Sequence, residues 1–142
     1  MPDDYNAALA NYRLDRASSE LASSRDNLSA GRYAESLSNS YYAIFHSVRA
    51  VLALEGKDFK KHSGVISYFQ VQYIKTGLFS KEISNFIQGA FRLRTKADYE
   101  DFYVAARIDA ERQLRNAEAI HAQVTEYIAR QKRKRTGREE SE

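Results

Sequence analysis

Hydrophobic positions recur along most of this chain at steps of three and four residues, the spacing of one face of an α-helix. In the first segment, roughly residues 4–30, Ser24 fills one slot of the pattern and the apolar positions are Leu14, Ala17, Leu21 and Leu28. Gly31 interrupts the periodicity. The first segment is therefore predicted to be a long helix with one buried face.

Two further segments show the same periodicity, and each is followed by a glycine. A second helix is predicted over about 33–55, with a buried face formed by Leu37, Tyr41, Ile44, Phe45, Val48 and Leu52. A third is predicted over about 63–76, and it would bury Val65, Ile66, Phe69 and Tyr73. Gly56 and Gly77 suit helix ends because glycine tolerates a left-handed backbone. The stretch KDFKKHSG between these two helices is predicted to be a loop.

Two more helices complete the pattern. Ser80 suits the cap of a fourth helix, whose inward positions would be Ile83, Phe86, Ile87 and Phe91. A long fifth helix is predicted to begin within 100–105 and to end near Arg130, with a stripe of Ile108, Leu114, Ala117, His121, Val124 and Ile128. No segment shows the sustained alternation of a strand. The predicted fold class is all-α, a single-domain antiparallel bundle of three long and two short helices.

The excess of positive charge lies entirely at the C-terminus of the chain. The net charge is +3, and residues 129–142 hold six of the 22 basic and three of the 19 acidic side chains, so the rest of the chain is neutral. We expect a helical domain over 1–130 and a disordered tail over 131–142. The basic residues of this tail either contact phosphates or form a solvated helix end, and they are Lys132, Arg133, Lys134 and Arg135.

Composition excludes several classes of site and protein. The chain has no cysteine, so disulfides and thiolate metal sites are excluded. It also lacks a glycine-rich phosphate loop, a histidine pair at helical spacing and a nucleophile elbow, so no cofactor and no metal are expected. The N-terminal segment has no signal-peptide core, and no apolar run approaches the ~20 residues that span a bilayer. We therefore expect a cytoplasmic protein without a membrane partner.

The three histidines allow structural and functional interpretations. His121 lies on the apolar stripe of the fifth helix, which favours packing. His46 forms a stripe with Tyr42 and Arg49, and this stripe is either a helix or subunit contact or an anion site. His62 follows Lys60 and Lys61, where it either holds a phosphate at a helix N-terminus or belongs to a simple cap.

The stretch FRLRTKADYEDFY contains the most suggestive chemistry. Arg94 and Asp98 are four residues apart, so they can pair across one turn of a helix, and Asp98 can alternatively end one helix or cap the next. An arginine fork also suits phosphate binding. A proton-transfer residue near neutral pH would be histidine, and here aspartate takes the second position.

These segments together resemble a known family. The stretch SNSYYAIFHSVRAVLALEGKDFKKHSGVISYF, then GLFSKEISNFIQGAFRLRTKADY, then a long alanine-rich helix are similar to the HEPN domain, over roughly residues 10–128. The resemblance is to the prokaryotic branch with tyrosines in the second helix, K-K-H-S-G after it and R-x-x-A-D-Y after the fourth. It implies an all-α bundle, a homodimer, and a partner protein of nucleotidyltransferase type in a toxin–antitoxin pair.

Many HEPN proteins are metal-independent RNases with an Arg-x4–6-His motif. This chain departs from that motif, since no histidine follows Arg92 or Arg94 before His121. An ionised Asp98 would repel a phosphodiester, and it would act as a general acid only with a strongly raised pKa. The predicted function is therefore a dimeric module that binds a partner protein, a nucleotide or RNA without cutting it. The alternative is a divergent RNase in which His46 or His62 supplies the missing imidazole.

The residues that carry these hypotheses form two groups. The candidate phosphate- or nucleotide-binding residues are Arg94, Tyr99, Lys61, His62, Arg49 and His46. The motif residues with an expected structural role are Asp98, Tyr41 and Tyr42. For the dimer, the second and fourth helices are expected to carry the contact, with Tyr42, His46 and Arg49 on its surface.

Overall fold

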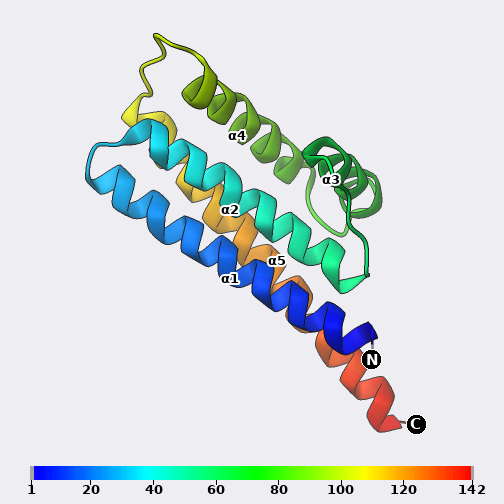
Figure 1. Ribbon diagram of the computed structural model, residues 1–142. Helices are drawn as coiled ribbons and strands as arrows, with labels where there is room; N and C mark the ends of the chain where they lie inside the picture. Colours follow the sequence, from blue (N-terminus) through cyan, green and yellow to red (C-terminus); the bar gives the residue numbers. More distant parts are fainter. Residues whose placement is uncertain (1, 142) are drawn as a thin grey trace.

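A computed structural model describes residues 2–141, with side chains described over 4–137. It is an all-α bundle, as predicted, and the part of the chain it describes contains no strand. The elements are α1 (Pro2–Ser29), α2 (Tyr33–Leu54), α3 (His62–Phe69), the π-helical turn η1 (Gln70–Ile74), α4 (Lys81–Tyr99) and α5 (Arg107–Ser141). Figure 1 shows α1, α2 and α5 as long, nearly parallel rods, with α3 and α4 packed on one side of them.

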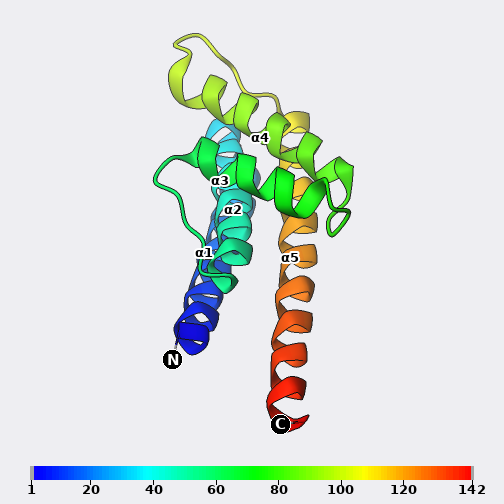
Figure 2. The ribbon, with the colours of Figure 1, turned by 90° about the vertical axis from the view of Figure 1, so that its right-hand side faces the viewer.

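Helix α2 is the central element, because it contacts α1, α3, α4 and α5. Its sequence explains this position: 15 of its 22 residues are buried, far more than a single helical face would require. In the view of Figure 2, α3 crosses in front of α2, α4 lies above α3, and α5 runs along the side. Side chains that α2 presents toward α3 and α4 are therefore placed where three elements meet.

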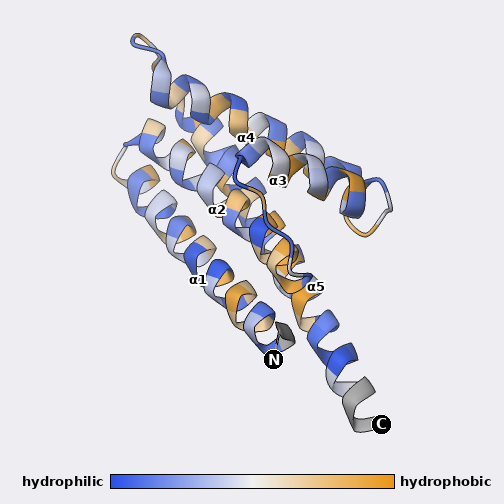
Figure 3. Cartoon of the chain, turned by 45° about the vertical axis from the view of Figure 1, so that its right-hand side comes forward, coloured by the Kyte–Doolittle hydropathy of each residue, from blue (hydrophilic) through white to orange (hydrophobic). Residues whose placement is uncertain are grey.

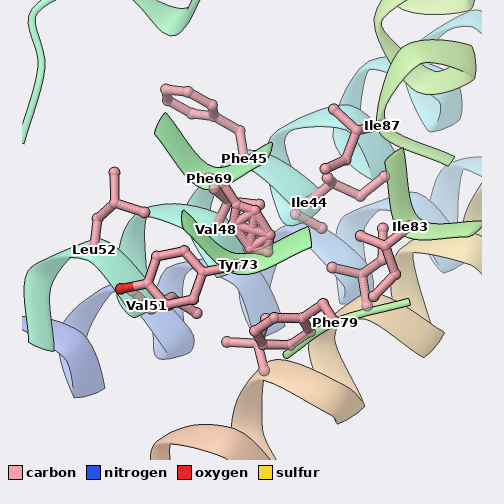
Figure 4. Close-up of a cluster of buried hydrophobic side chains, with 14 of the residues drawn as sticks. Ile44, Phe45, Val48, Val51, Leu52, Phe69, Tyr73, Phe79, Ile83 and Ile87 are labelled. Atoms are coloured by element: carbon pink, nitrogen blue, oxygen red, sulfur yellow. The ribbon is translucent and has the colours of Figure 1, made fainter. Parts of the chain in front are cut away.

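The core lies between α2, α3, η1, α4 and α5, and Figure 4 shows its aromatic and branched side chains interdigitating. The rings of Phe69 and Phe79 lie 5.2 Å apart, and the ring of Tyr127 from α5 lies 5.3 Å from that of Phe79. Helices α3 and α5 are thus joined through a ring from the loop between η1 and α4. The core positions expected for the second helix are all buried, and they are Leu37, Tyr41, Ile44, Phe45, Val48 and Leu52.

The contact between α1 and α2 contains a buried polar group near the turn that joins the two helices. Ser24, in the slot that interrupts the apolar stripe, is fully buried, and its Oγ lies 2.8 Å from Oγ of both Ser36 and Ser40. Ser36 Oγ also donates to the carbonyl oxygen of Ser24 at 3.0 Å. Each buried hydroxyl therefore has a partner, and the small side chains let the two helices approach closely.

Three glycines with positive φ lie just after helix ends, and they are Gly31, Gly56 and Gly77. Gly31 and Gly77 have φ values of +80° and +83°, and a Cβ at either position would meet nothing within 4 Å. The need for glycine at these sites is therefore conformational and not steric. Gly31 lies in the short turn through which α2 returns antiparallel to α1.

Several boundaries and inward positions differ from the sequence predictions. Phe91 and Ile108, both expected to point inward, are 50% and 61% exposed. Phe91 lies on the side of α4 turned toward α3, where the packing leaves a pocket, and Ile108 lies in the first turn of α5. Helix α4 has 19 residues, so it is longer than expected, and α5 begins at Arg107 and continues to Ser141.

The segment predicted to be a disordered tail continues α5 as helix in this structure. Lys132 donates to Asn11 Oδ1, and Arg135 donates to the carbonyl oxygen of Leu54 at 3.2 Å. These contacts join the start of the segment to α1 and α2. The domain boundary at residue 130 stays a prediction, and the side chains of residues 138–142 lie outside the described part.

The hydropathy colouring in Figure 3 shows apolar positions turned toward the helix contacts and polar positions outward, with a strongly hydrophilic stretch in the C-terminal half of α5. Among the helices of residues 2–141, none combines the length and apolar character needed to cross a bilayer.

Candidate functional site

The guanidinium of Arg94 lies between α4 and α2. Its Nη2 donates to Tyr42 Oη at 2.8 Å, and its Nε lies 2.8 Å from Asp98 Oδ2. The second contact is an ion pair without a well-aligned hydrogen bond, because Nε has no partner at a favourable angle. The side chains of Arg94 and Asp98 are 14% and 30% exposed. Since α4 extends to Tyr99, both residues belong to one helix, and the pairing across one turn is the arrangement that the structure adopts.

Three tyrosine rings surround this guanidinium. The Cζ atom of Arg94 lies 5.2 Å from the ring centroid of Tyr41, 5.3 Å from that of Tyr42 and 5.5 Å from that of Tyr99. A cation within about 6 Å of an aromatic face is attracted by the negative face of the ring. Burial disfavours the charge of Arg94, but Tyr42, Asp98 and the other two tyrosines outweigh this effect and raise its pKa. Arg94 is therefore a charged and largely enclosed side chain.

His62, the first residue of α3, reaches the same place from the third element. Its Nδ1 shares a 3.1 Å hydrogen bond with Tyr41 Oη, and its ring lies 3.9 Å from the ring centroid of Phe45. Burial lowers the pKa of His62, and the charges of Arg94 and Arg49 lower it further. The imidazole is thus mostly neutral near pH 7, so one of its nitrogens can accept a proton.

Tyr41 connects the imidazole to the guanidinium. Its ring lies under Arg94, its hydroxyl meets His62, and burial raises its pKa although Arg94 acts in the opposite direction. We use the term Arg94 cluster for the six residues that meet here: Arg94, Asp98, Tyr99, Tyr41, Tyr42 and His62. The structure therefore brings six of the nine predicted site residues together, from α2, α3 and α4.

Arg49, three residues after His46, belongs to a separate group of ion pairs around Asp58. Nη2 of Arg13 and Nη2 of Arg49 lie 3.1 and 3.2 Å from Asp58 Oδ2, and Nη1 of Arg13 donates to the carbonyl oxygen of Arg49 at 3.1 Å. Burial would raise the pKa of Asp58, but the N–H of Phe59 and the two arginines lower it. This network ties the loop after α2 to α1.

His46 itself is buried, with 8% of its surface exposed, and its Nδ1 has no hydrogen-bond partner. Burial lowers its pKa to about 4, with added contributions from Arg16 and Arg49, so the ring is neutral near pH 7. The stripe of Tyr42, His46 and Arg49 is thus occupied by contacts inside the chain. Tyr42 and Arg49 are only partly buried, so the hypothesis that this stripe lies on the surface of a dimer contact stays a prediction.

Two pockets meet at His62. One, of about 390 Å³, is lined by charged and aromatic residues: Phe45, Arg49, Asp58, Phe59, Lys60 and His62. The other, of about 470 Å³, lies between α2, α3 and α4, with an apolar wall that includes Ile66, Ile87 and Phe91. Lys61, which precedes α3, lines its mouth and makes no capping side-chain bond. Lys61 therefore lies beside the Arg94 cluster, in a pocket that it lines together with Tyr41 and His62.

Sequence reasoning missed Asp58 and Phe45 as members of these groups. Asp58 lay in a stretch treated only as a loop, although an acid among the basic residues of KDFKKH was a usable signal. Phe45 was predicted to belong to the core, and it is buried there while its ring also packs against the ring of His62. Over residues 4–137, no group of three or more His, Asp or Glu side chains is placed to hold a metal ion.

The Arg94 cluster thus combines one guanidinium, one carboxylate, one imidazole and three tyrosine rings. Comparison with known proteins identifies the family. The profile of the HEPN domain matches residues 10–127. The chain belongs to the HEPN domain family. This match covers every residue of the Arg94 cluster and both pockets.

Individual relatives come from bacteria and archaea. A "UPF0332 protein" from Thermotoga maritima is 33% identical over 66% of this chain and 70% of its own length. A candidate toxin of Methanocaldococcus jannaschii is 36% identical over 52% of this chain and 60% of its own length. A second candidate toxin of the same organism is 28% identical over 81% of this chain and 78% of its own length.

A solved structure confirms the fold. The crystal structure of TT1696 from Thermus thermophilus matches with a TM-score of 0.70 and 19% identity, over 82% of this chain and 96% of that one. At this identity the likeness concerns the arrangement of the helices alone.

Proposed function

We propose that this HEPN protein is a dimeric, cytoplasmic module of toxin–antitoxin type that binds RNA or a nucleotide through the Arg94 cluster and does not cleave it. Two similar proteins of M. jannaschii carry the name of candidate toxins, which supports the toxin–antitoxin setting. The observation that carries the rest of the proposal is the 2.8 Å pairing of Arg94 with Asp98.

This pairing favours binding over cleavage for a physical reason. Cleavage of RNA by its own 2′-hydroxyl needs a group that moves protons beside the phosphate and a cation that stabilises the charge of the transition state. Here the cation already faces a carboxylate, which repels a phosphodiester that has to lie beside the guanidinium for cleavage. Aromatic side chains, by contrast, suit recognition, because every base can stack on a ring. Tyr99 is 69% exposed and lies at the edge of the cluster, so its ring is accessible to a base.

Binding can be measured by the fluorescence anisotropy of a labelled single-stranded RNA at fixed salt. We expect Tyr99→Ala to weaken binding by about tenfold, since a base stacked on an aromatic side chain contributes ~1–3 kcal/mol. Tyr12→Ala is the matched control, because Tyr12 is a comparably exposed tyrosine on the distant helix α1. Equal affinities of the two variants would contradict a binding site at the Arg94 cluster.

A second function is favoured by one observation, the 3.1 Å bond between His62 and Tyr41. Through Tyr41, this bond places the mostly neutral imidazole of His62 near the guanidinium of Arg94. The cluster would act as a metal-independent RNase if a substrate phosphate contacted both the imidazole and the guanidinium. This RNase would cleave single-stranded RNA in EDTA, and His62→Ala would abolish the cleavage while His121→Ala would not. Intact RNA after incubation of the wild-type protein in EDTA excludes this function and agrees with the first.

The proposed protein partner is a nucleotidyltransferase, as the resemblance to toxin–antitoxin HEPN proteins implies. Co-expression of this chain with a nucleotidyltransferase encoded next to it, followed by size-exclusion chromatography, tests the pair. A complex that elutes as one species supports the partnership, and separate elution of the two proteins contradicts it.

A further inference from the structure

Two apolar features of the surface have no counterpart within the described chain. The first is the pocket of about 470 Å³ between α2, α3 and α4, walled by Ile66, Ile87 and Phe91. The second is the loop between α4 and α5, in which Phe102 is 98% exposed and Val104 is 87% exposed. Exposed apolar side chains that gather on one segment, next to each other, are typical of an interaction site.

The loop presents Phe102 at the tip of a turn. The N–H of Tyr103 donates to the carbonyl oxygen of Glu100 at 3.4 Å, which closes the turn around Asp101 and Phe102. In Figure 1 this loop rises away from the bundle beyond the end of α4. Phe102 is therefore held out as an apolar protrusion, and the pocket of about 470 Å³ is large enough to admit its ring.

The charges around the two features are complementary. The protrusion directly follows two acidic residues, Glu100 and Asp101. Lys61 lines the mouth of the pocket, and Lys60 precedes it. Opposite charges around an apolar contact set its orientation and speed its formation.

The pocket and the Phe102 loop lie at different positions along α4. Ile87 and Phe91 lie in the middle of α4, whereas Phe102 follows its C-terminal end. If two copies pack with their α4 helices antiparallel around a two-fold axis, each protrusion reaches the pocket of the other copy. A two-fold contact uses the same surface patch twice, so one geometry satisfies both protrusions and both pockets.

We propose that a second copy of this chain occupies the pocket, and that each copy inserts Phe102 between α3 and α4 of the other. This inference rests on the dimer of the proposed function and specifies its surface. The exchange brings the acidic turn of one copy to Lys61 and His62 of the other. The complete binding site then contains residues from both copies, with Tyr99 at the base of the inserted loop.

The first experiment measures the molar mass of the purified full chain by light scattering over a dilution series. We expect a dimer for the wild type and an increase of at least about tenfold in the dissociation constant for Phe102→Glu. Tyr12→Glu is the matched control, since it places the same charge at an exposed aromatic position on α1. Circular dichroism of Phe102→Glu should match the wild type, because a residue that is 98% exposed supports no packing within the chain.

A mixing experiment tests the reciprocal insertion. Ser67 is exposed and lines the pocket, so Ser67→Phe should fill the pocket while Phe102 stays available. The Phe102→Glu chain keeps its pocket and lacks its protrusion. Each variant alone should dimerise at least about tenfold more weakly than the wild type. An equimolar mixture should form a heterodimer through the one intact insertion, with an affinity between those of the single variants and the wild type.

Three results would overturn the inference, and they separate it from the proposed function. A wild-type chain that is monomeric at high concentration refutes the dimer itself and leaves a different protein as the occupant of the pocket. A dimer that tolerates Phe102→Glu as well as Tyr12→Glu refutes this surface but keeps the dimer. Failure of the mixture to form heterodimers shows that Phe102 does not enter the pocket. Loss of RNA binding with the dimer intact concerns the proposed function alone.

Discussion

The ion pair of Arg94 with Asp98 allows a quantitative test of how much the cluster stabilises the fold. Asp98→Asn keeps the size of the side chain and removes its charge, which leaves a guanidinium that is only 14% exposed without its anion. Exposed pairs of this spacing contribute ~0.3–0.5 kcal/mol, and removal of one member of a fully buried pair costs ~3–5 kcal/mol. The contribution of this pair lies between these two values, because Asp98 is 30% exposed and Tyr42 Oη still accepts a hydrogen bond from Arg94.

A second effect acts in the opposite direction. Asp98 lies in the last turn of α4, where the helix dipole disfavours a negative charge by ~0.3–0.5 kcal/mol. We therefore expect Asp98→Asn to lower the free energy of unfolding by about 1–1.5 kcal/mol, from an intermediate pair contribution of about 1.5–2 kcal/mol. For a domain of this size the melting temperature would fall by about 4–6 °C.

The assay is urea unfolding followed by circular dichroism, at one protein concentration because dimer formation would shift the midpoint. Glu126→Gln is the control, since Glu126 pairs with Arg130 at the same spacing on α5 and also with Arg133, and all three side chains are more than half exposed. It should change the free energy of unfolding by less than about 0.5 kcal/mol. Equal losses for the two variants would refute the reasoning that enclosure of Arg94 by the tyrosines makes its partner important.

The remaining predictions concern pH, a helix end and the α1–α2 contact. The pKa of His46 in the folded chain is about 4, below its value in the unfolded chain, so the unfolded chain binds more protons between the two values. The free energy of unfolding should therefore fall by up to ~3 kcal/mol as the pH drops from about 6.5 to 4. Urea midpoints across this range should vary less in His46→Gln than in the wild type. Gly31→Ala should lower the free energy of unfolding by ~1–2 kcal/mol, because Gly31 has a φ of +80°. Gly137→Ala, within α5, should leave the free energy of unfolding unchanged or raise it, and thermal melting of the two variants compares them. Ser24→Val removes a buried hydroxyl with three close hydrogen-bond partners, so it should lower the free energy of unfolding by ~1–3 kcal/mol. An unchanged melting temperature would show that these hydrogen bonds make no net contribution to stability.

Most of the fold was predictable because helix periodicity and glycine stops are local signals. The buried face of α2 and the ends near Gly31, Gly56 and Gly77 depend on neighbouring residues alone, and all appear as expected. Phe91 shows the limit of this reasoning. Its spacing indicates the buried face of α4, yet it is half exposed, because the distance between α3 and α4 decides whether a position is filled or borders a pocket.

The candidate site was predictable in its residues but not in its grouping. Arg94 and Asp98 are four residues apart in sequence, so their pairing followed from helix geometry. His46 and His62 were indistinguishable as sources of an imidazole near Arg94. The structure separates them, since His62 meets Tyr41 whereas His46 is buried among arginines that keep it neutral.

The sequence by itself determined an all-α chain, the ends of its first two helices, and an arginine with an acid one turn away. All of these follow from interactions within a few residues, which act before the chain is compact. Only the tertiary structure decided that three tyrosines enclose Arg94, that His62 reaches the same cluster, and that Phe102 stays in water while an apolar pocket lies open between α3 and α4. Those outcomes depend on how α3 and α4 pack against α2, and packing is set by side chains that are distant in sequence.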